Sequence, residues 1–388
     1  MTETAFELPE DLREFRALVR EIAEERIAPR AADIDETDEW PKDVWELLVQ
    51  NELMAVGYPE EFGGAGGGSL TFAVMIEEIS RVSAGAALTP LVARLGAIPV
   101  MLSGSDQLKH ELFGGISRGD HLMSYGLTEP GSGSDSVAMQ TRYERVGGAD
   151  GGGFRLSGTK RFITGAGVSD AYTVFATRDP ALRADGISAF VVYRDDPGVS
   201  FGKEERKMGI HGSPTREVYL ERTEIPADRL IGQEGEGFKI AMRTLDYSRP
   251  SIGAQALGIA QGAFDIAARY LTEREQFGQK LARFQGLQFM LADMAMQIEA
   301  ARLLVYKAAS LVDAQDPQMT YFASVAKCHA SDTAMAVTTD AVQLLGGYGY
   351  MREYGVERFM RDAKITQIYE GTNQIQRLVI ARQVLKAL

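Results

Sequence analysis

The acid with the most suggestive neighbours in the chain is Glu370, which follows Ile368 and Tyr369. These two side chains can exclude water from the carboxylate, and burial raises a carboxyl pKa and makes the group a stronger base. Thr372 or Asn373 can cap the helix that follows. An acid in this position also fits a solvated residue near a helix start. The segment therefore indicates a candidate proton acceptor that needs further support.

Four other segments combine residue types that suit a bound ligand. Residues 125–135 place hydroxyls beside glycines, which let backbone N–H groups approach a ligand closely. Residues 158–165 end in an aromatic ring and a hydroxyl, which suit a flat heterocycle. Residues 274–278 supply an arginine fork for phosphate oxygens, and residues 343–350 place glycines after a helix. Each segment also has a plain explanation as a turn, a hairpin or a helix end.

Composition limits the classes of protein that the chain can belong to. Its 388 residues are enough for two or three packed regions. The formal net charge of −13 argues against sequence-independent nucleic-acid binding, which needs cations to neutralise phosphates. Four scattered histidines and the single Cys328 offer no spacing typical of a metal site.

Cysteine content and hydropathy bear on where the protein works. One cysteine cannot form an intrachain disulfide, which fits a reducing compartment, so we expect a cytoplasmic protein. The acidic start lacks the basic and apolar regions of a secretory signal. We also expect no membrane span, because no apolar run approaches the ~18 residues that a span needs.

Three regions with different residue patterns follow one another along the chain. Helical spacing of apolar residues runs from Asp11 to about His121 and resumes at Gly235. Between them, Ala171–Thr177 and Ile187–Tyr193 are typical strands bounded by turns, which suggest an antiparallel barrel or sandwich. The prediction is an α+β fold with an N-terminal helical domain (1–121), a middle β domain (122–233) and a C-terminal helical bundle (234–388).

Two apolar faces mark a long helix in the last third of the chain. The first face comprises Leu287, Met290, Leu291, Met294, Ile298 and Val305. The second face adds Phe289, Met296 and Leu303. A helix that is apolar on more than one side is buried in a bundle or at an oligomer interface.

The five ligand-type segments, in this order on a helix–sheet–helix chain, resemble the acyl-CoA dehydrogenase family. Residues 125–135 and 369–372 match the two signature regions of that family, and the resemblance runs from about Leu12 to the end. It implies a helical domain, a β domain and a C-terminal four-helix bundle. It also implies FAD between the last two domains, reaching a neighbouring subunit of a homotetramer.

The resemblance implies a role for each matching residue. Contacts to FAD are implied for Tyr125, Leu127, Thr128, Ser134, Phe162, Thr164, Arg274, Phe277, Gln285, Gln343, Gly346, Gly347, Thr372 and Gln374. The residues from Arg274 to Gly347 would hold its pyrophosphate and adenosine across the subunit interface. Contacts to substrate are implied for Ser134, Asp246, Arg249 and Gly371, with Tyr247 and Ser248 in the same CoA-binding position. Glu370 is the implied catalytic base.

The implied reaction is the α,β-dehydrogenation of a short-, medium- or branched-chain acyl-CoA, as in fatty acid β-oxidation. The Glu370 N–H and a flavin ribityl hydroxyl would polarise the thioester carbonyl. Glu370 would take the α-proton while a β-hydride passes to flavin N5, which gives a trans-2-enoyl-CoA. Electrons would then leave to an electron-transfer flavoprotein.

The chain departs from the common family pattern in two places. Phe162 stands where many members have tryptophan, and it still provides an aromatic face. The following glycine-containing turn, residues 165–167, also differs from the commoner asparagine-containing one. Some members carry the base on another helix, near residues 247–249, but this chain has no glutamate there.

Three alternatives share the fold. An acyl-CoA oxidase passes electrons to oxygen, but such chains are usually longer than 388 residues. A glutaryl-CoA-type dehydrogenase needs a cation in the acyl pocket. The equivalent region, residues 84–88, is neutral, although Arg94 lies nearby and keeps this alternative open. A non-catalytic subunit would have lost Glu370 or the FAD segments, and both are present.

Overall fold

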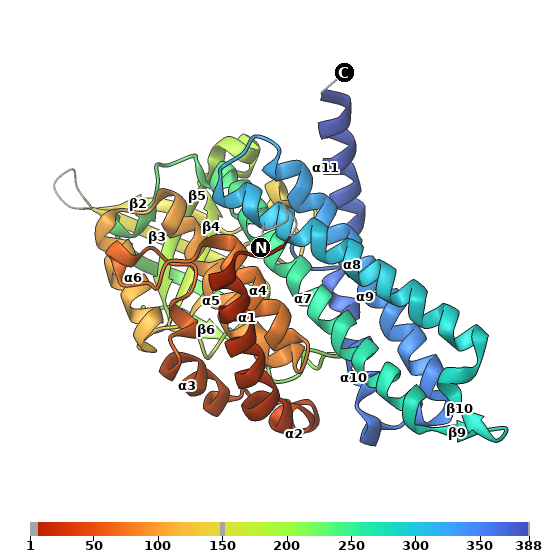
Figure 1. Ribbon diagram of the computed structural model, residues 1–388. Coiled ribbons are helices and arrows are strands. Elements are labelled where there is room, and N and C mark those ends of the chain that lie inside the picture. Colours follow the sequence, from red (N-terminus) through yellow and green to blue (C-terminus); the bar gives the residue numbers. More distant parts are fainter. Residues whose placement is uncertain (1–6, 148–151, 387–388) are drawn as a thin grey trace.

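The computed structural model describes residues 7–147 and 152–386. Figure 1 shows a sheet on one side of the molecule and long helices on the other, with further helices between them. The order of helices, strands and helices confirms the predicted α+β fold. The glycine-rich stretch 147–153, for which the sequence predicts a hairpin or surface loop, includes residues 148–151, which lie outside the described residues.

The N-terminal region is helical, as predicted. Its helices are α1 (Glu10–Ile22), α2 (Ala31–Thr37), α3 (Lys42–Gln50), α4 (Gly68–Ser80), α5 (Ala84–Ser103) and α6 (Asp106–Arg118). Most side chains of α4 and α5 are buried. Helices that are apolar on nearly all sides must lie inside the protein. Both pack against the long C-terminal helix α7 (Gly237–Glu273), and α5 also contacts the sheet.

Helix α5 corrects one expectation from the sequence. Its 20 residues contain an 18-residue window with a mean hydropathy of 1.6, long and apolar enough to cross a membrane by length and composition. The expectation that no apolar run approaches this length was therefore wrong. Within the protein, 72% of that window is buried, as in a helix that forms part of a core. Ser83 caps the helix by accepting the Ala86 N–H at 3.3 Å.

The middle region forms one mixed sheet. Its strands are β1 (Met123–Gly126), β2 (Arg142–Val146), β3 (Gly153–Thr164), β4 (Ala171–Thr177), β5 (Ile187–Tyr193), β6 (Val199–Phe201), β7 (Thr215–Pro226) and β8 (Leu230–Ile231). The order is β6-β7-β3-β2-β4-β5-β8, with β1 also paired to β4. Strands β4 and β5 have the predicted bounds. The sheet is not antiparallel throughout, because β4 pairs in parallel with β1 and β2.

The C-terminal region is a helical bundle. It contains α7, the short strands β9 (Glu275–Gln276) and β10 (Gln279–Lys280), and then α8 (Gln285–Asp313), α9 (Met319–Leu345), α10 (Val356–Thr366) and α11 (Asn373–Lys386). Helices α7, α8 and α9 pack against one another, and α10 and α11 pack on α9. In Figure 1 the β9–β10 hairpin lies at the end of the bundle remote from the sheet. The domain boundaries near residues 121 and 233 stay a prediction.

The two predicted apolar faces of α8 have different surroundings. On the first face, Met294, Ile298 and Val305 are buried against the bundle. On the second, Phe289, Met296 and Leu303 keep 60%, 63% and 51% of their surface exposed. This second face therefore stays exposed among the residues that the structure describes.

Candidate active site

Glu370 lies in a tight turn between α10 and α11. Its φ is +50° and that of Gly371 is +92°, so two successive residues are left-handed. A glutamate is uncommon in this conformation, and strain of about 1–3 kcal/mol persists where the surrounding structure enforces it. The Asn373 N–H donates to the Gln367 carbonyl at 3.0 Å and closes the turn. A strained turn therefore sets the position of the carboxylate.

Lys327 on α9 holds this turn in place. Its Nζ donates to the Gly371 carbonyl at 2.8 Å and to Asn373 Oδ1 at 2.9 Å. The Gln376 side-chain amide donates to the same Gly371 carbonyl at 2.9 Å. Burial lowers the pKa of Lys327 to about 8, with the negative charge of Glu370 opposing the change. The left-handed turn is thus tied to two helices of the bundle.

The Glu370 carboxyl is poised to exchange a proton near neutral pH. Burial raises its pKa to about 7. The Ser248 hydroxyl, which donates to Glu370 Oε2, and the charges of Arg249 and Lys327 all lower the pKa, and burial outweighs them. A base with a pKa close to the working pH suits general acid–base chemistry.

A small cavity lies against the Glu370 carboxylate. Its empty volume is about 180 Å³, including open solvent, and its lining comprises Glu370, Ser248, Ser251, Phe72, Leu91, Arg94, Leu95 and Ile98. The last four residues are spaced i, i+3, i+4 and i+7 along α5, so they form one face of that helix. Half of the lining residues therefore form a single helical stripe, which includes one cation.

The groups that keep water from Glu370 differ from those expected. Ile368 is 49% exposed, so it does not bury the carboxylate. Tyr369 packs against the main core and its hydroxyl donates to Gln255 on α7. The low-polarity surroundings come instead from Phe72 on α4 and from the α5 stripe, which no local pattern around residue 370 could reveal.

The α7 residues matched to CoA binding lie next to the base. Arg249 is buried, and its Nη1 donates to Asp246 at 3.1 Å and to Ser324 at 3.3 Å. Burial raises the pKa of Asp246, while Arg249 opposes that change. Tyr247 packs in a small apolar cluster. The structure thus brings Arg249 and Gly371 near the base, and places Asp246 beyond Arg249.

The loop after β1 is anchored by a buried ion pair. Glu129 accepts from Lys160 Nζ at 2.8 Å and from the Gln140 and Thr141 N–H groups at 2.5 and 3.0 Å. Burial lowers the pKa of Lys160 to about 8, and the Glu129 charge opposes that change. Leu127 and Thr128, the two residues before Glu129, are half-buried. The pair thus fixes the loop that carries the first predicted ligand-binding residues.

Tyr125 connects this loop to the base. Its hydroxyl is buried and has no hydrogen-bond partner in the described parts of the chain. Burial raises the pKa of Tyr125 well above 10, and the charge of Glu370 adds to the increase. Ser134, at the far end of the loop, is exposed. Tyr125 is therefore brought together with Glu370, whereas Ser134 faces solvent in the single chain.

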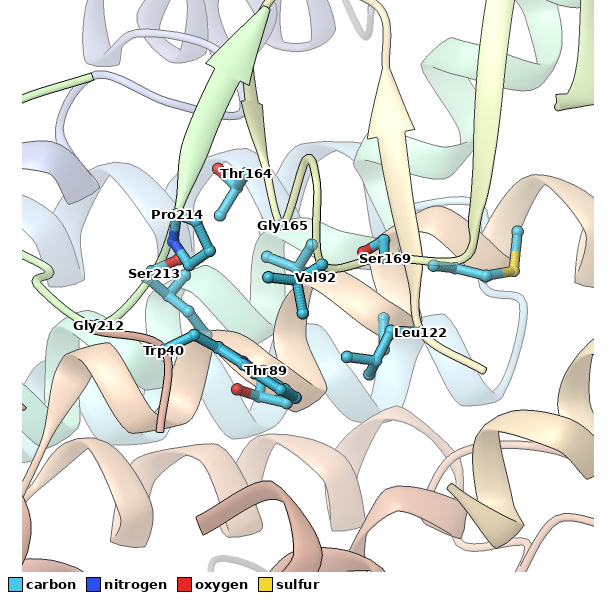
Figure 2. Close-up of a pocket in the computed structure, with 14 residues that line it drawn as sticks. Trp40, Thr89, Val92, Leu122, Thr164, Gly165, Ser169, Gly212, Ser213 and Pro214 are labelled. Atoms are coloured by element: carbon cyan, nitrogen blue, oxygen red, sulfur yellow. The ribbon is translucent and has the colours of Figure 1, made fainter. Parts of the chain in front are cut away.

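Phe162 and Thr164 close the end of β3. Phe162 has a φ of +57° at a bulge in the β3–β7 pairing, and 58% of its surface is exposed. Thr164 lines a second, larger pocket with an empty volume of about 300 Å³. Figure 2 shows Thr164 across this pocket from Trp40 and Thr89. Because its lining contains no acid or base, the smaller cavity at Glu370 is the better candidate for proton transfer.

Comparison with known proteins decides the family. Three family models match: acyl-CoA dehydrogenase N-terminal domain at residues 9–120, middle domain at 124–223 and C-terminal domain at 235–385. This chain belongs to the acyl-CoA dehydrogenase family. It is 50% identical to the probable acyl-CoA dehydrogenase fadE25 of Mycobacterium leprae, over 98% of this chain and 97% of that protein.

Solved structures that resemble this chain support the same family assignment. Butyryl-CoA dehydrogenase from Megasphaera elsdenii is 41% identical with a TM-score of 0.94, over 98% of this chain and 100% of the other. A chain from a study of the electron transferring flavoprotein of Acidaminococcus fermentans is 45% identical with a TM-score of 0.95, over 99% and 100%. As an acyl-CoA dehydrogenase, the protein is a FAD-dependent oxidoreductase that dehydrogenates acyl-CoA thioesters.

The remaining predicted cofactor residues of this acyl-CoA dehydrogenase lie elsewhere in the bundle. Arg274 stacks over the Tyr348 ring at 5.5 Å, and this contact joins the start of the β9–β10 hairpin to the turn after α9. The neighbouring residues are exposed, with Phe277 at 94%: Phe277, Gln285, Gln343, Gly346 and Gly347. Thr372 and Gln374 instead lie beside the base at the start of α11. The predicted set therefore divides into two groups.

The residues around the base fit a flavin. The Tyr125 hydroxyl is a buried group without a described partner, and Phe162 is 58% exposed, with the Arg161 guanidinium carbon 4.9 Å from the centre of its ring. An added Cβ at Gly131 or Gly133 would meet nothing within 4 Å, so the loop leaves room for a ligand. An added Cβ at Gly346 or Gly347, in the group of predicted FAD residues near Arg274, would also meet nothing within 4 Å.

Sequence reasoning missed one residue of the site, Lys327, which contacts the turn from 44 positions away. Arg94, which the sequence places only near the acyl pocket, lines the cavity from α5. Ser248 had been matched to CoA binding, but here its hydroxyl contacts the base itself. No local spacing points to these contacts, because only the packing of α5, α7 and α9 creates them.

Proposed function

We propose that Glu370 is the base that removes the α-proton of a bound acyl-CoA. The observation that carries the proposal is a carboxyl with a pKa of about 7, held in a strained turn against a mostly apolar cavity. A carboxylate can accept a proton from carbon only when that carbon is positioned and acidified. The cavity supplies the position, because its walls hold the acyl chain against the carboxylate.

The backbone of the turn offers a donor that acidifies the α-carbon. The Glu370 N–H has no acceptor among the described residues, and a thioester carbonyl oxygen can fill that role. A hydrogen bond to this oxygen stabilises the negative charge that develops when the α-proton leaves. The same residue thus binds the thioester through its backbone and takes the proton through its side chain.

The loop residues Tyr125, Leu127 and Thr128 and the β3 residues Phe162 and Thr164 would hold the flavin ring against the substrate. When bound, FAD supplies the acceptor for the β-hydride. Asp246 and Arg249 would contact the CoA portion, with Ser134 near both ligands, and Gly371 would contact the thioester. The product is a trans-2-enoyl-CoA, as in the first dehydrogenation of fatty acid β-oxidation.

A homotetramer with a shared cofactor site accounts for the second group of predicted FAD residues. Arg274 supplies a cation for the pyrophosphate, but it lies at the hairpin remote from the sheet in Figure 1. We propose that this group reaches the FAD of a neighbouring subunit, together with Gln285 and Gln343. The uncovered face of α8 supports an interface between subunits.

An electron-transfer flavoprotein is the proposed electron acceptor. The similarity to the chain studied with the Acidaminococcus fermentans electron transferring flavoprotein supports this assignment. A cytoplasmic location is proposed on the single cysteine, Cys328, which is free and buried.

Replacement of the base tests the proposal directly. We expect the purified protein to be yellow and an acyl-CoA to bleach its flavin absorbance without oxygen. Glu370→Gln should retain FAD but bleach about 100- to 10,000-fold more slowly, because the amide cannot accept the α-proton. The measurement is anaerobic stopped-flow absorbance of the flavin.

A matched control separates the base from general acidity. Glu353 is an exposed acid in the same part of the chain, so Glu353→Gln should bleach at the parent rate. If Glu370→Gln also bleaches at the parent rate, Glu370 is not the base. A protein that stays colourless after incubation with FAD would overturn the flavoenzyme assignment itself.

A further inference from the structure

The end of strand β3 is held by two buried serines. Ser124 lies on β1, directly before Tyr125, and Ser169 follows the turn after β3. Their side-chain oxygens are 2.8 Å apart, and the Ser124 hydroxyl donates to the Thr164 carbonyl at 2.6 Å. The two serines are only 0% and 2% exposed. A buried hydrogen bond therefore joins the strand that leads into the loop after β1 to the last residue of β3.

The direction of these hydrogen bonds follows from the number of protons. A serine hydroxyl carries one proton, and that of Ser124 is used by the Thr164 carbonyl. Ser169 must therefore donate its own proton to the Ser124 oxygen. In such a chain, each hydrogen bond polarises and strengthens the next. Ser169 thus acts on Thr164 through Ser124.

The peptide group between Thr164 and Gly165 is fixed at both ends. Its carbonyl accepts from Ser124 at 2.6 Å, and its N–H donates to the Pro214 carbonyl at 2.7 Å, directly before β7. The turn that follows is closed by the Ser169 N–H, which donates to the Gly165 carbonyl at 2.8 Å. This peptide group therefore has little freedom to rotate, and the position of Thr164 is fixed with it.

Gly165 matches the serine pair in shape. Its φ is +80°, and an added Cβ would lie 2.6 Å from Ser124 Oγ and 2.8 Å from Ser169 Oγ. Contacts this short force one of the groups to move. The glycine-containing turn at residues 165–167, which departs from the common family pattern, therefore leaves the space that the two hydroxyls occupy.

We propose that Ser124 and Ser169 are positioning residues, which fix Thr164 relative to the loop after β1 and so set the spacing of the two segments that hold the flavin. This inference rests on the proposed function, which assigns both segments to FAD. Neither serine needs to touch the cofactor. Loss of the Ser124 hydroxyl leaves the Thr164 carbonyl without this donor, so the end of β3 should move relative to the loop.

Removal of each hydroxyl tests the assignment, with FAD titrated into the apoprotein and bleaching followed by anaerobic stopped-flow absorbance. Ser124→Ala should weaken FAD binding by about ten-fold or more and lower the maximal bleaching rate by a similar factor. The acyl-CoA concentration that gives half the maximal rate should stay within about two-fold of the parent value, because neither serine is assigned to the substrate. Ser169→Ala should have smaller effects, since Ser124 still donates to Thr164.

Ser188 on β5 provides the matched control. It is also fully buried, and its hydroxyl donates to the Tyr143 hydroxyl at 3.0 Å and accepts the Gly235 N–H at 2.9 Å. Among the described hydrogen bonds, none joins Ser188 to Thr164. Ser188→Ala should lose stability in urea unfolding much as Ser124→Ala does, but it should retain the FAD affinity and bleaching rate of the parent protein.

The shape of the turn gives a second test. Gly165→Ala should weaken FAD binding in the parent protein, because its Cβ overlaps both hydroxyl oxygens. The positive φ strains alanine in any background, so a smaller effect in the double variant Ser124→Ala/Ser169→Ala isolates the overlap with the two hydroxyls.

Tryptophan fluorescence reports on the turn without FAD. Trp40 lines the larger pocket together with Gly165 and Ser169 (Figure 2), and Trp45 is the other of the two tryptophans in the chain. In apoprotein that carries Trp45→Phe, Ser124→Ala should shift the emission of Trp40, whereas the control substitution on β5 should leave it unchanged.

The outcomes separate this inference from the proposed function. Parent-like FAD affinity and bleaching in Ser124→Ala, equal losses in Ser124→Ala and Ser188→Ala, or an unchanged Trp40 emission overturns the positioning role and leaves the proposed function standing. If Ser124→Ala folds poorly, Ser169→Ala provides the same comparisons with smaller effects. If no acyl-CoA bleaches the flavin of the parent protein, the proposed function itself fails.

Discussion

At the scale of single residues, the candidate base is governed by opposing effects. Burial raises the pKa of Glu370 to about 7, while Ser248, Arg249 and Lys327 lower it. Without these three groups, the carboxyl would stay protonated to a higher pH and would be a base in a smaller fraction of molecules. Lys327 also fixes the Gly371 carbonyl, so one side chain influences both the charge and the position of the base.

The pH dependence of flavin reduction follows from this balance. Only the ionised Glu370 accepts a proton, so the bleaching rate should rise as pH increases through about 7 and then level off. Ser248→Ala removes a hydrogen bond that favours the ionised form, so the midpoint should move to higher pH. Stopped-flow bleaching across pH 5.5 to 9 measures both midpoints. An unchanged midpoint in Ser248→Ala would contradict the assigned role of the Ser248 hydroxyl.

The sequence identifies the candidate base through the other ligand-type segments of the chain, but it does not reveal which residues pack around it. Five segments in a fixed order pointed to Glu370, whereas the local expectation that Ile368 would exclude water was wrong. Arg94 and Lys327 act on the cavity and the turn across long separations in the chain. Such contacts arise from helix packing, which residue spacing within one segment does not encode.

At the scale of elements, the loop after β1 depends on the Glu129–Lys160 pair. Lys160→Met would leave the Glu129 carboxylate buried without its cation, and we expect a loss of about 3–5 kcal/mol in the free energy of unfolding. Urea unfolding followed by circular dichroism measures the change. FAD retention should weaken in parallel, because the same loop carries Tyr125 and Thr128.

An exposed ion pair serves as the control for that substitution. Lys280 and Glu275 are 2.9 Å apart on the β9–β10 hairpin, with about half of each side chain exposed. Lys280→Met should cost less than about 1 kcal/mol, since water and salt screen exposed pairs. A loss for Lys160→Met as small as that for Lys280→Met would show that the buried pair does not anchor the loop.

Local patterns predict elements better than they predict pairing. Alternating β-branched and aromatic residues place β4 and β5 at the correct bounds. The parallel pairing of β4 with β1 and β2 was not predicted, because it joins strands separated along the chain. Helix α5 was not recognised as a long apolar element, since Arg94 and two prolines interrupt its sequence.

At the scale of the whole molecule, the two groups of predicted FAD residues imply an assembly. We expect a tetramer in sedimentation experiments, with Phe289, Met296 and Leu303 of α8 buried between subunits. Met296→Glu should disrupt assembly, because a charge in an apolar interface is costly to desolvate. The ratio of flavin to protein absorbance should fall with it, since Arg274 of a neighbouring subunit would no longer reach the cofactor.

Leu18 on α1 is a comparable exposed apolar residue, at 52% against 63% for Met296. Leu18→Glu should leave both the assembly and the FAD content as in the parent protein. Monomeric Met296→Glu that retains full FAD affinity would show that each subunit holds its cofactor alone.

The α5 stripe has a consequence for how such an enzyme diversifies. Leu91, Arg94, Leu95 and Ile98 shape the cavity from one helix, whereas the base, the loop and the anchoring lysine belong to other elements. We therefore expect substitutions at these four positions to alter which acyl group is accepted without disturbing the proposed proton acceptor. After gene duplication, two copies could then diverge in substrate specificity while they keep the same reaction. A small combinatorial library at these four codons would test this in the laboratory.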